Sequence, residues 1–363
     1  ITFVLPYSAD IGNVDFLKLI PAGNIKVRRI SSILQPYMTS QEYKKSLGKK
    51  SSPKIYGSTL FDEVYRYTLA AEKIAEEEDF DVIHCHDWMT FGAGIRAKKK
   101  KNKPLVLHVH STELDRTGGH QVNQYVYDLE RHGMRNADKI IAVSNFTKSK
   151  IMTHYSVPSE KISVVHNAVD FSQHAHDENF EIKKTDRVVL FLGRITLQKG
   201  PDYFVYAAKK VLEHEKNVKF IMAGSGDMEP FVIEKSAELG ISDKVLFAGF
   251  LNQRDVERAY KMADIYVMPS VSDPFGITAL EAMKNKASVI VSKQSGVSEV
   301  VKHCLKVDFW DINEISNKII SLLRYKPLHE TLKENAYFEV KKFNWDVPAQ
   351  KCIEVYNEAI SKG

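Results

Sequence analysis

Cysteine is scarce in this sequence, and its few copies stand far apart. Among 363 residues only Cys85, Cys304 and Cys352 occur, an odd number without close spacing. A disulfide framework needs paired cysteines and an oxidising compartment, so this usage is typical of a reducing one. Residues 1–5 also read as a strand and not as the charged and then apolar start of a secretory signal. We therefore expect a cytoplasmic protein.

Long apolar runs and a strong charge of one sign are missing as well. No apolar run reaches the roughly 18 residues that a helix needs to cross a bilayer. The net charge is +5, and the lysine run at 98–101 suits the end of a helix, where cations complement the dipole. That run has no interleaved aromatic residues and no nucleic-acid motif beside it. We expect neither a membrane span nor a nucleic-acid partner.

Composition and periodicity indicate a folded α/β protein. With 44% hydrophobic and 27% charged residues over 363 positions, the chain suits an ordered protein of two domains. Short apolar segments alternate with longer amphipathic ones, which favours parallel sheets with helices on both faces. A helix is expected at 60–77. The expected strands are 1–5, 82–85, 105–109, 140–143, 162–165, 188–192, 219–222, 245–248, 265–268 and 288–291.

The stretch 166–187 is polar, rich in charge and without a clear period, so it is the natural linker. We therefore place a first domain at 1–170 and a second at 171–344. Ligands of doubly wound domains bind at the carboxyl ends of the strands. The active site is expected in the cleft between the two domains.

The most informative segment joins two carboxylates to a helix start. Asp273 and Glu281 stand eight positions apart across a Pro-Phe-Gly turn. Pro274 favours a helix start, Gly276 allows close backbone approach, and the amides of residues 275–278 would then face an anion. Alone, the two acids would be a helix-cap region and a solvated helix acid. A sugar nucleotide would instead give each acid hydroxyls to bind, one set on the sugar and the other on the ribose.

A second loop carries two cations. Arg194 and Lys199 stand five residues apart in Gly-Arg-Ile-Thr-Leu-Gln-Lys-Gly, directly after the apolar strand at 188–192. A strand that runs into such a loop can place both cations at one phosphate pair. Without a neighbouring site, they would be ordinary surface charges.

These segments resemble the motifs of retaining GT-B glycosyltransferases, the group that includes glycogen and starch synthases. Its Glu-x7-Glu motif matches here with Asp273 in place of the first Glu. Residues 81–88, 107–111 and 165–170 match further motifs in the family's order. The resemblance implies two Rossmann-like domains that face a cleft, with a final helix at 345–363 that packs back on the first. It also implies metal-independent transfer of a hexosyl group, glucosyl above all, from ADP- or UDP-glucose to a glycan acceptor.

The resemblance carries residue roles with it. It assigns Arg194 and Lys199 to the donor diphosphate, Glu281 to the ribose, and Asp273 and His110 to the transferred sugar. Asp87 and Trp88 match an acceptor-side motif. Gly224 and Ser225 either approach the nucleotide or make a tight turn. The remaining donor-side residues are Gly193, Phe250, Leu251, Phe275, Gly276, Ile277 and Thr278.

No cofactor beyond the nucleotide-sugar co-substrate and no metal is expected. His84 and His86 flank Cys85 on a strand, where adjacent side chains point to opposite faces, so the three cannot form one metal site. The pair Asp79 and Asp81 is better read as a solvated loop. Nothing in the sequence supplies a carboxylate nucleophile on the opposite sugar face, which favours retention by a front-face route.

One family feature is missing. The first 90 residues hold no Gly-Gly or Gly-x-Gly, although the family's first strand leads into a glycine-rich loop. We expect the first domain to lack its first βα unit, which leaves the activity of the chain as written open. Other readings also stay open: a mannosyl, sucrose-type or lipopolysaccharide-type transferase, an epimerase or phosphorylase, or a non-catalytic nucleotide- or carbohydrate-binding relative. Donor base, donor sugar, acceptor and oligomeric state are not decided by the sequence.

Overall fold

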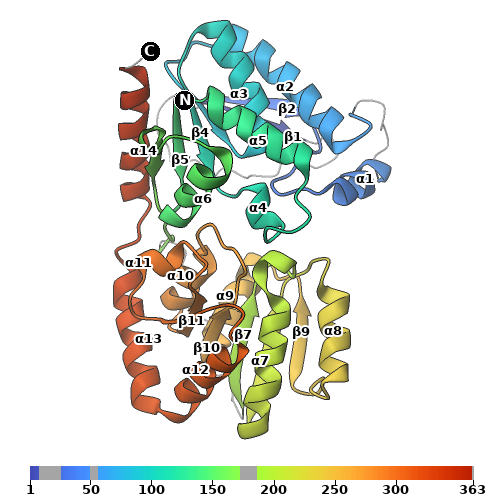
Figure 1. Cartoon of the computed structure of the whole chain (residues 1–363), viewed down its shortest axis with the longest axis vertical. Coiled ribbons are helices and arrows are strands. Elements are labelled where there is room, and N and C mark those ends of the chain that lie inside the picture. Colours follow the sequence, from blue (N-terminus) through green and yellow to red (C-terminus); the bar gives the residue numbers. More distant parts are fainter. Residues whose placement is uncertain (8–25, 50–55, 172–185, 362–363) are drawn as a thin grey trace.

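A computed structural model describes residues 1–7, 26–49, 56–171 and 186–361. Two α/β domains stack along the long axis of the molecule, the first drawn in blue to green and the second in yellow to red (Figure 1). The first domain contains β1 (Thr2–Tyr7), β2 (Lys26–Ser31), α1 (Ser40–Gly48), α2 (Leu60–Glu77), β3 (Ile83–His86), α3 (Trp88–Lys101), β4 (Leu105–Val109), α4 (Glu113–Arg116), α5 (Gln124–Asn136), β5 (Lys139–Ala142), α6 (Asn145–Tyr155), the 3-10 turn η2 (Ser159–Lys161) and β6 (Ile162–Val164).

The second domain repeats the strand–helix alternation. It contains β7 (Arg187–Leu192), the 3-10 turn η3 (Leu197–Lys199), α7 (Pro201–His214), β8 (Val218–Ala223), α8 (Glu229–Glu238), β9 (Val245–Gly249), α9 (Gln253–Met262), β10 (Ile265–Met268), α10 (Ile277–Lys284), β11 (Ser288–Ser292), α11 (Val297–Val300), β12 (Leu305–Val307), α12 (Ile312–Arg324) and α13 (Lys326–Val340). The last helix, α14 (Asp346–Ile360), leaves this domain and runs beside the first one (Figure 1).

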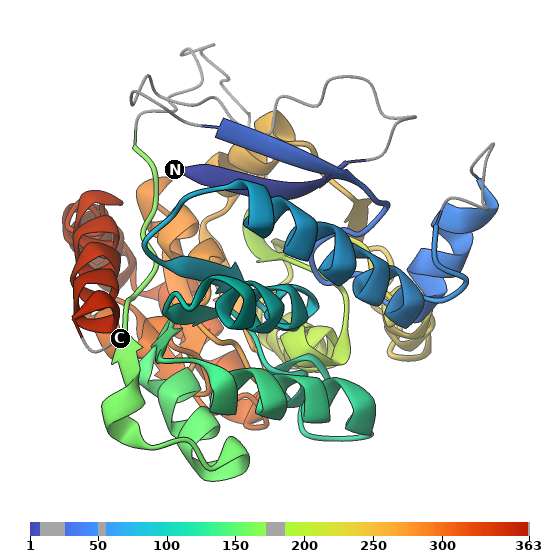
Figure 2. The same cartoon turned by 90° about the horizontal axis from the view of Figure 1, so that it is seen from above.

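Parallel strands form the centre of both domains. The first sheet has the order β3-β4-β5-β6, and the second has the order β12-β11-β10-β7-β8-β9. Strands β4, β5, β10 and β11 are buried along their whole length, as expected for parallel strands covered on both faces. Strands β1 and β2 pair with each other in a separate two-stranded sheet (Figure 2). The expected doubly wound α/β fold is therefore confirmed.

The two faces of the first sheet are covered differently. Leu105 and Leu107 on β4 belong to the larger core, together with residues of α2, α3 and α5. Val106, which points to the opposite face, packs with Val355 and Ala359 of α14. The final helix thus covers the face of the first domain that carries the even-numbered residues of β3 and β4.

The sequence pattern located the elements well. The expected helix at 60–77 is α2 with the same bounds, and every expected strand is present within two residues at either end. The pattern missed α1, β2 and the short strand β12. Most of the expected linker, residues 172–185, lies outside the described residues, so the boundary at 170 stays a prediction. The lack of a first βα unit also stays a prediction.

Direct side-chain contacts join the two domains. Ser144 donates its hydroxyl to the carbonyl of Pro274 at 2.6 Å. Lys150 and Ser272 both donate to Oδ1 of the buried Asp115, at 2.7 and 2.6 Å. The loop that precedes α10 is therefore fixed against the first domain. Within the described part of the chain, no helix is both long and apolar enough to cross a membrane.

Candidate donor and acceptor site

The loops after β7 and β8 approach each other closely. Gly224 has φ +134°, and a Cβ there would lie 1.8 Å from the carbonyl oxygen of Gly193. The amide of Ile195 donates to the carbonyl of Ser225 at 2.9 Å. Gly224 is thus required for backbone packing of the two loops, which is the tight-turn alternative for this residue. Its contact with a nucleotide stays a prediction.

Arg194 projects from the β7 loop toward the first domain. Its Nη2 donates to Oε1 of Gln198 at 2.7 Å. The guanidinium also lies 5.0 Å from the ring centre of Tyr37, a residue of the first domain. The guanidinium therefore stands at the interface of the two domains, and sequence reasoning missed its aromatic partner. Tyr37 has φ +60°, unusual for a non-glycine residue, but only the fold shows what its ring faces.

Lys199 and Asp273 form an ion pair. Lys199 closes the short 3-10 turn η3, and its Nζ lies 2.7 Å from Oδ2 of Asp273. Asp273 is only 3% exposed and also accepts a hydrogen bond from the hydroxyl of Ser270 at 3.3 Å. The first acid of the predicted motif and the predicted diphosphate lysine are therefore adjacent, and each neutralises the other.

The start of α10 has the geometry expected of a phosphate cradle. Gly276 caps the helix with φ +98°, which favours glycine, and the first-turn amides of Ile277 and Thr278 have no acceptor within the helix. The hydroxyl of Tyr266 donates to Oγ1 of Thr278 at 2.8 Å. Phe275 is buried in the core of the second domain. A small pocket beside this helix is lined by Gly193, Lys199, Ser270 and Thr278, which brings the two predicted loops together.

Glu281 lies one helical turn further along α10. The hydroxyl of the buried Tyr260 donates to its Oε2 at 2.9 Å. Burial raises the pKa of Glu281 above its ordinary value, while the bond from Tyr260 acts to lower it. Tyr260 is a supporting residue that the sequence did not reveal, since a tyrosine on an amphipathic helix gives no such signal.

Phe250 and Leu251 follow β9 at the carboxyl edge of the same sheet. The side chain of Phe250 is 83% exposed, which is unusual for an aromatic residue. Gly249 before it has φ +66° and turns the chain out of the sheet. An exposed ring at a strand end is available for a base, so the predicted nucleotide role stays a prediction with a suitable geometry.

Asp87 and His110 come from the carboxyl ends of β3 and β4. Oδ1 of Asp87 accepts the backbone amides of His110 at 2.8 Å and of Ser111 at 3.3 Å. Burial raises the pKa of Asp87 to about 6, although the bond from His110 and the charge of Arg116 act in the opposite direction. The carboxylate thus shapes the loop that carries His110. Its acceptor-side role stays a prediction.

Trp88 is only 6% exposed and packs beside Phe61, with ring centres 6.1 Å apart. Part of its surface lines a pocket between α2, α3 and α5 that also includes Tyr125 and Arg96. Little of its ring is therefore open to a sugar in the cleft. Contact with an acceptor stays a prediction for this residue.

Four histidines gather on one face of β3 and β4. His86 Nδ1 lies 2.8 Å from His110 Nε2, and the rings of His108 and His110 stack with centres 4.2 Å apart. Burial lowers the pKa of both His86 and His110 to about 4, so both rings are neutral at pH 7. Because Nε2 of His110 is hydrogen-bonded to His86, Nδ1 is the ring nitrogen left to contact a ligand.

Models of two glycosyltransferase families match consecutive parts of this chain. Residues 40–173 match Glycosyltransferase Family 4, and residues 172–338 match Glycosyl transferases group 1. Together they cover both sheets, and their border coincides with the segment expected to link the domains.

Known relatives agree with these matches. An uncharacterized glycosyltransferase of Methanocaldococcus jannaschii is 34% identical over 300 residues, which is 78% of this chain and 76% of that protein. A D-inositol 3-phosphate glycosyltransferase of Catenulispora acidiphila is 27% identical over 80% of this chain and 74% of that protein.

Solved structures show the same fold. Sucrose-phosphate synthase from Thermosynechococcus elongatus superposes with a TM-score of 0.80 at 19% identity, over 100% of this chain and 89% of that one. Anabaena HepE in complex with UDP and glucose superposes with a TM-score of 0.72 at 18% identity, over 92% of this chain and 86% of that one. The two family matches and the archaeal relative show that the chain belongs to the group 1 and family 4 glycosyltransferases and is a glycosyltransferase enzyme.

Proposed function

We propose that this enzyme transfers a glucosyl group from a nucleotide sugar to a glycan hydroxyl with retention at the anomeric carbon, as glycogen and starch synthases do. The observation that carries the proposal is that Lys199 and Thr278 of the first turn of α10 line one pocket, while Lys199 is paired with Asp273. UDP-glucose is the donor to test first, because HepE, which shares the fold, was solved in complex with UDP and glucose.

The donor diphosphate would lie between the β7 loop and α10. Lys199 lines this place, and Arg194 on the same loop would add a second positive charge. The amides of Ile277 and Thr278 would supply oriented donors. These groups would stabilise the charge that builds on the diphosphate when the anomeric C–O bond breaks. Because the chain provides this charge itself, transfer should need no divalent cation at the donor.

The sugar and the ribose would lie on either side of the diphosphate. Asp273 would bind hydroxyls of the transferred sugar once the diphosphate draws Lys199 away, and Glu281 would bind those of the ribose. A neutral His110 can donate or accept through Nδ1 at the sugar without adding charge. Asp273 is assigned to the sugar hydroxyls, and the sequence supplies no carboxylate nucleophile on the opposite face of the sugar. We therefore propose a front-face route, in which the leaving group departs and the acceptor attacks on the same side of the sugar.

A second candidate differs only in the acceptor. The relative from Catenulispora acidiphila is a D-inositol 3-phosphate glycosyltransferase, so a phosphorylated polyol is the alternative to a glycan. Both acceptors offer a hydroxyl nucleophile, and the residues of the donor site would be the same for either.

The experiment that tests the proposal is an NMR assay of product formation. The enzyme receives UDP-glucose or ADP-glucose, with either an α-glucan oligosaccharide or D-inositol 3-phosphate, in the presence of EDTA. An α-linked glucosyl product supports retention, and the productive acceptor decides between the two candidates. Lys199→Ala is the reference with strongly reduced activity. A β-linked product, or turnover only after a divalent cation is added, would overturn the proposed mechanism.

A further inference from the structure

A pattern repeated in two neighbouring strands places four imidazoles on one face of the first sheet. Histidines alternate with apolar residues at His84 and His86 on β3, and at His108 on β4 and His110 directly after it. The register pairs His86 with His108, so all four rings project to the face that α14 covers. Cys85 packs into the opposite core, as the alternation of a strand requires. The sequence argument against a His-Cys-His site therefore holds for Cys85, but it did not consider the histidines of β4.

Buried ring nitrogens in this cluster have no protein partner. His108 is 8% exposed, and neither of its ring nitrogens makes a hydrogen bond within the described residues. Nε2 of His84 is buried and lacks a partner there as well. Buried polar atoms of this kind are uncommon, and each one calls for a ligand, an ion or a water. The unpartnered atoms of this cluster are imidazole nitrogens, which are common ligands of transition metals.

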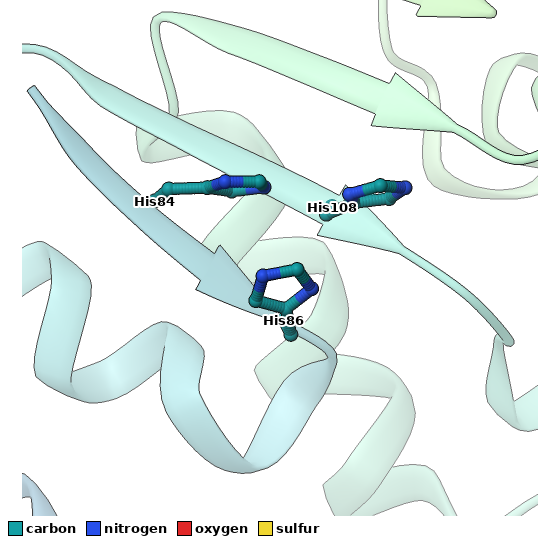
Figure 3. A group of neighbouring side chains, drawn as sticks. All are labelled: His84, His86 and His108. Atoms are coloured by element: carbon teal, nitrogen blue, oxygen red, sulfur yellow. The ribbon is translucent and has the colours of Figure 1, made fainter. Parts of the chain in front are cut away.

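The three rings are close enough to share an ion. One ring nitrogen from each of His84, His86 and His108 lies within 4.8 Å of the others. Figure 3 shows the ring of His84 directed along the sheet toward that of His108, with His86 between them at the end of β3. Zn–N bonds of about 2.1 Å in a tetrahedral site separate ligand nitrogens by about 3.4 Å. Small rotations of the side chains would close the remaining gap while the strands stay in place.

Two neighbours would orient the ligands from outside. The hydroxyl of Tyr356 on α14 lies 2.7 Å from Nδ1 of His84, so the nitrogen of that ring left to face an ion is Nε2. On the other side, His110 is bonded to Nδ1 of His86. Partners of this kind fix ring orientation and tautomer around metal-bound histidines. The cluster therefore has both a ligand set and its supporting hydrogen bonds.

We propose that His84, His86 and His108 form a site for a divalent transition metal of zinc type, oriented by Tyr356 and adjacent to His110. Three neutral imidazoles are a known ligand set for such an ion, with a fourth position left for water or another donor. The site departs from the sequence expectation of no metal. None of its ligands is a residue proposed to hold the diphosphate, so the site leaves the proposal of metal-independent transfer at the donor as it stands.

A consequence follows for catalysis, and it rests on the proposed function. His110 stacks on His108 and is bonded to His86, so an ion held by these two rings would restrict the motion of His110. Because His110 is placed at the transferred sugar, zinc should then lower transfer without changing nucleotide affinity. The metal site itself does not depend on this consequence.

Cobalt binding tests the site directly. Protein without a polyhistidine tag is freed of metal by dialysis against a chelator and titrated with Co²⁺, and the visible d–d absorption of low-coordinate cobalt is recorded. We expect one equivalent to bind and Zn²⁺ to displace it. His84→Phe and His108→Phe keep a ring of similar size but remove the nitrogens, and each should weaken cobalt binding at least about tenfold. His214→Ala, which changes an exposed histidine of α7, is the matched control.

Tyr356→Phe separates a metal site from mere packing. The change leaves all three ligands and the ring of residue 356, and should weaken cobalt binding about tenfold through loss of the bond to His84. Absence of the cobalt band in folded wild-type protein would overturn the proposal. Unchanged affinity for Co²⁺ in both His84→Phe and Tyr356→Phe would also overturn it. These two variants keep the test decisive if His108→Phe does not fold. Cobalt absorption does not depend on turnover, so failure of the transferase proposal would leave this result interpretable.

Discussion

Lys199 and Asp273 are 74 positions apart in the chain, yet the ammonium of one lies 2.7 Å from the carboxylate of the other. Asp273 is 3% exposed, so the pair is largely withdrawn from water. The pair keeps a cation in the pocket beside the first turn of α10, where the proposed diphosphate would need one. The diphosphate would compete with Asp273 for Lys199 and release the carboxylate to the sugar.

Loss of the ammonium should affect the chemical step. Lys199→Ala is expected to lower kcat/KM by about 30- to 900-fold, which corresponds to about 2–4 kcal/mol of transition-state stabilisation. Steady-state kinetics with UDP-glucose measures this. Lys261→Ala, on the surface of α9, is the control and should stay within about twofold of wild type. A Lys199→Ala enzyme as active as this control would remove Lys199 from the mechanism.

Tyr260 should support Glu281. Tyr260→Phe removes a hydrogen bond to a half-buried carboxylate whose pKa burial already raises. The pKa of Glu281 should then rise further, so that a larger fraction of Glu281 is protonated at mildly acid pH. We expect nucleotide affinity to fall about five- to tenfold, the effect of roughly 1 kcal/mol, and to fall more at pH 5.5 than at pH 8. Calorimetric titration at both pH values checks this, and equal affinities in both proteins would show that Glu281 does not contact the nucleotide.

Tyr37 should matter for donor binding although it belongs to the other domain. Its ring lies 5.0 Å from the guanidinium carbon of Arg194. Tyr37→Ala should raise the KM for the donor about two- to thirtyfold, since a cation–π contact is worth about 0.5–2 kcal/mol. Tyr37→Phe keeps the ring and should remain close to wild type. The reverse order, with Phe as damaging as Ala, would point to the hydroxyl and not to the ring.

Asp87 should make stability depend on pH. Its pKa in the folded protein is about 6, raised by burial from 3.8. Both folded and unfolded forms carry the proton below pH 3.8, whereas between 3.8 and 6 only the folded form keeps it. The contribution of Asp87 to the free energy of unfolding is therefore fully present at low pH. It is lost as the pH rises through 6, and the loss amounts to about 2–3 kcal/mol.

Comparison with Asp87→Asn isolates this effect. The histidines have depressed pKa values, so their contribution has the opposite sign and falls away as the pH drops below about 6.5. That contribution is common to both proteins and cancels in the difference. Urea unfolding at pH 4 and pH 7.5 measures the free energy of unfolding of both proteins. From the lower to the higher pH, the difference between them should shift in favour of Asp87→Asn by about 2–3 kcal/mol. An identical difference at both pH values would contradict the raised pKa of Asp87.

Most of the fold could be predicted because its signals are local. Buried parallel strands such as 105–109 and 265–268 are short apolar runs, and α2 begins at a capping box formed by Thr59 and Asp62. The strand β2, with two arginines, lacks that apolar signal. The site motifs were equally local, since Asp273 and Glu281 lie on one loop and helix.

Contacts between distant segments could not be predicted. Two such contacts are those of Tyr37 with Arg194 and of Tyr356 with His84. They depend on how the two domains and the final helix pack, which the spacing of residues in the sequence does not reveal. The histidine cluster is an intermediate case. The repeat in β3 and β4 was visible, but only their parallel register shows that His86 and His108 face each other.

Binding of UDP by calorimetry in the presence of EDTA tests the central claim, a metal-independent donor site in the second domain, most directly. UDP, ADP and GDP are titrated into wild type and into Glu281→Ala. We expect UDP to bind wild type without metal and to bind Glu281→Ala at least about tenfold more weakly, as loss of a charged hydrogen bond implies. No binding by any nucleotide, binding only after a divalent cation is added, or equal affinity in Glu281→Ala would contradict the site described here.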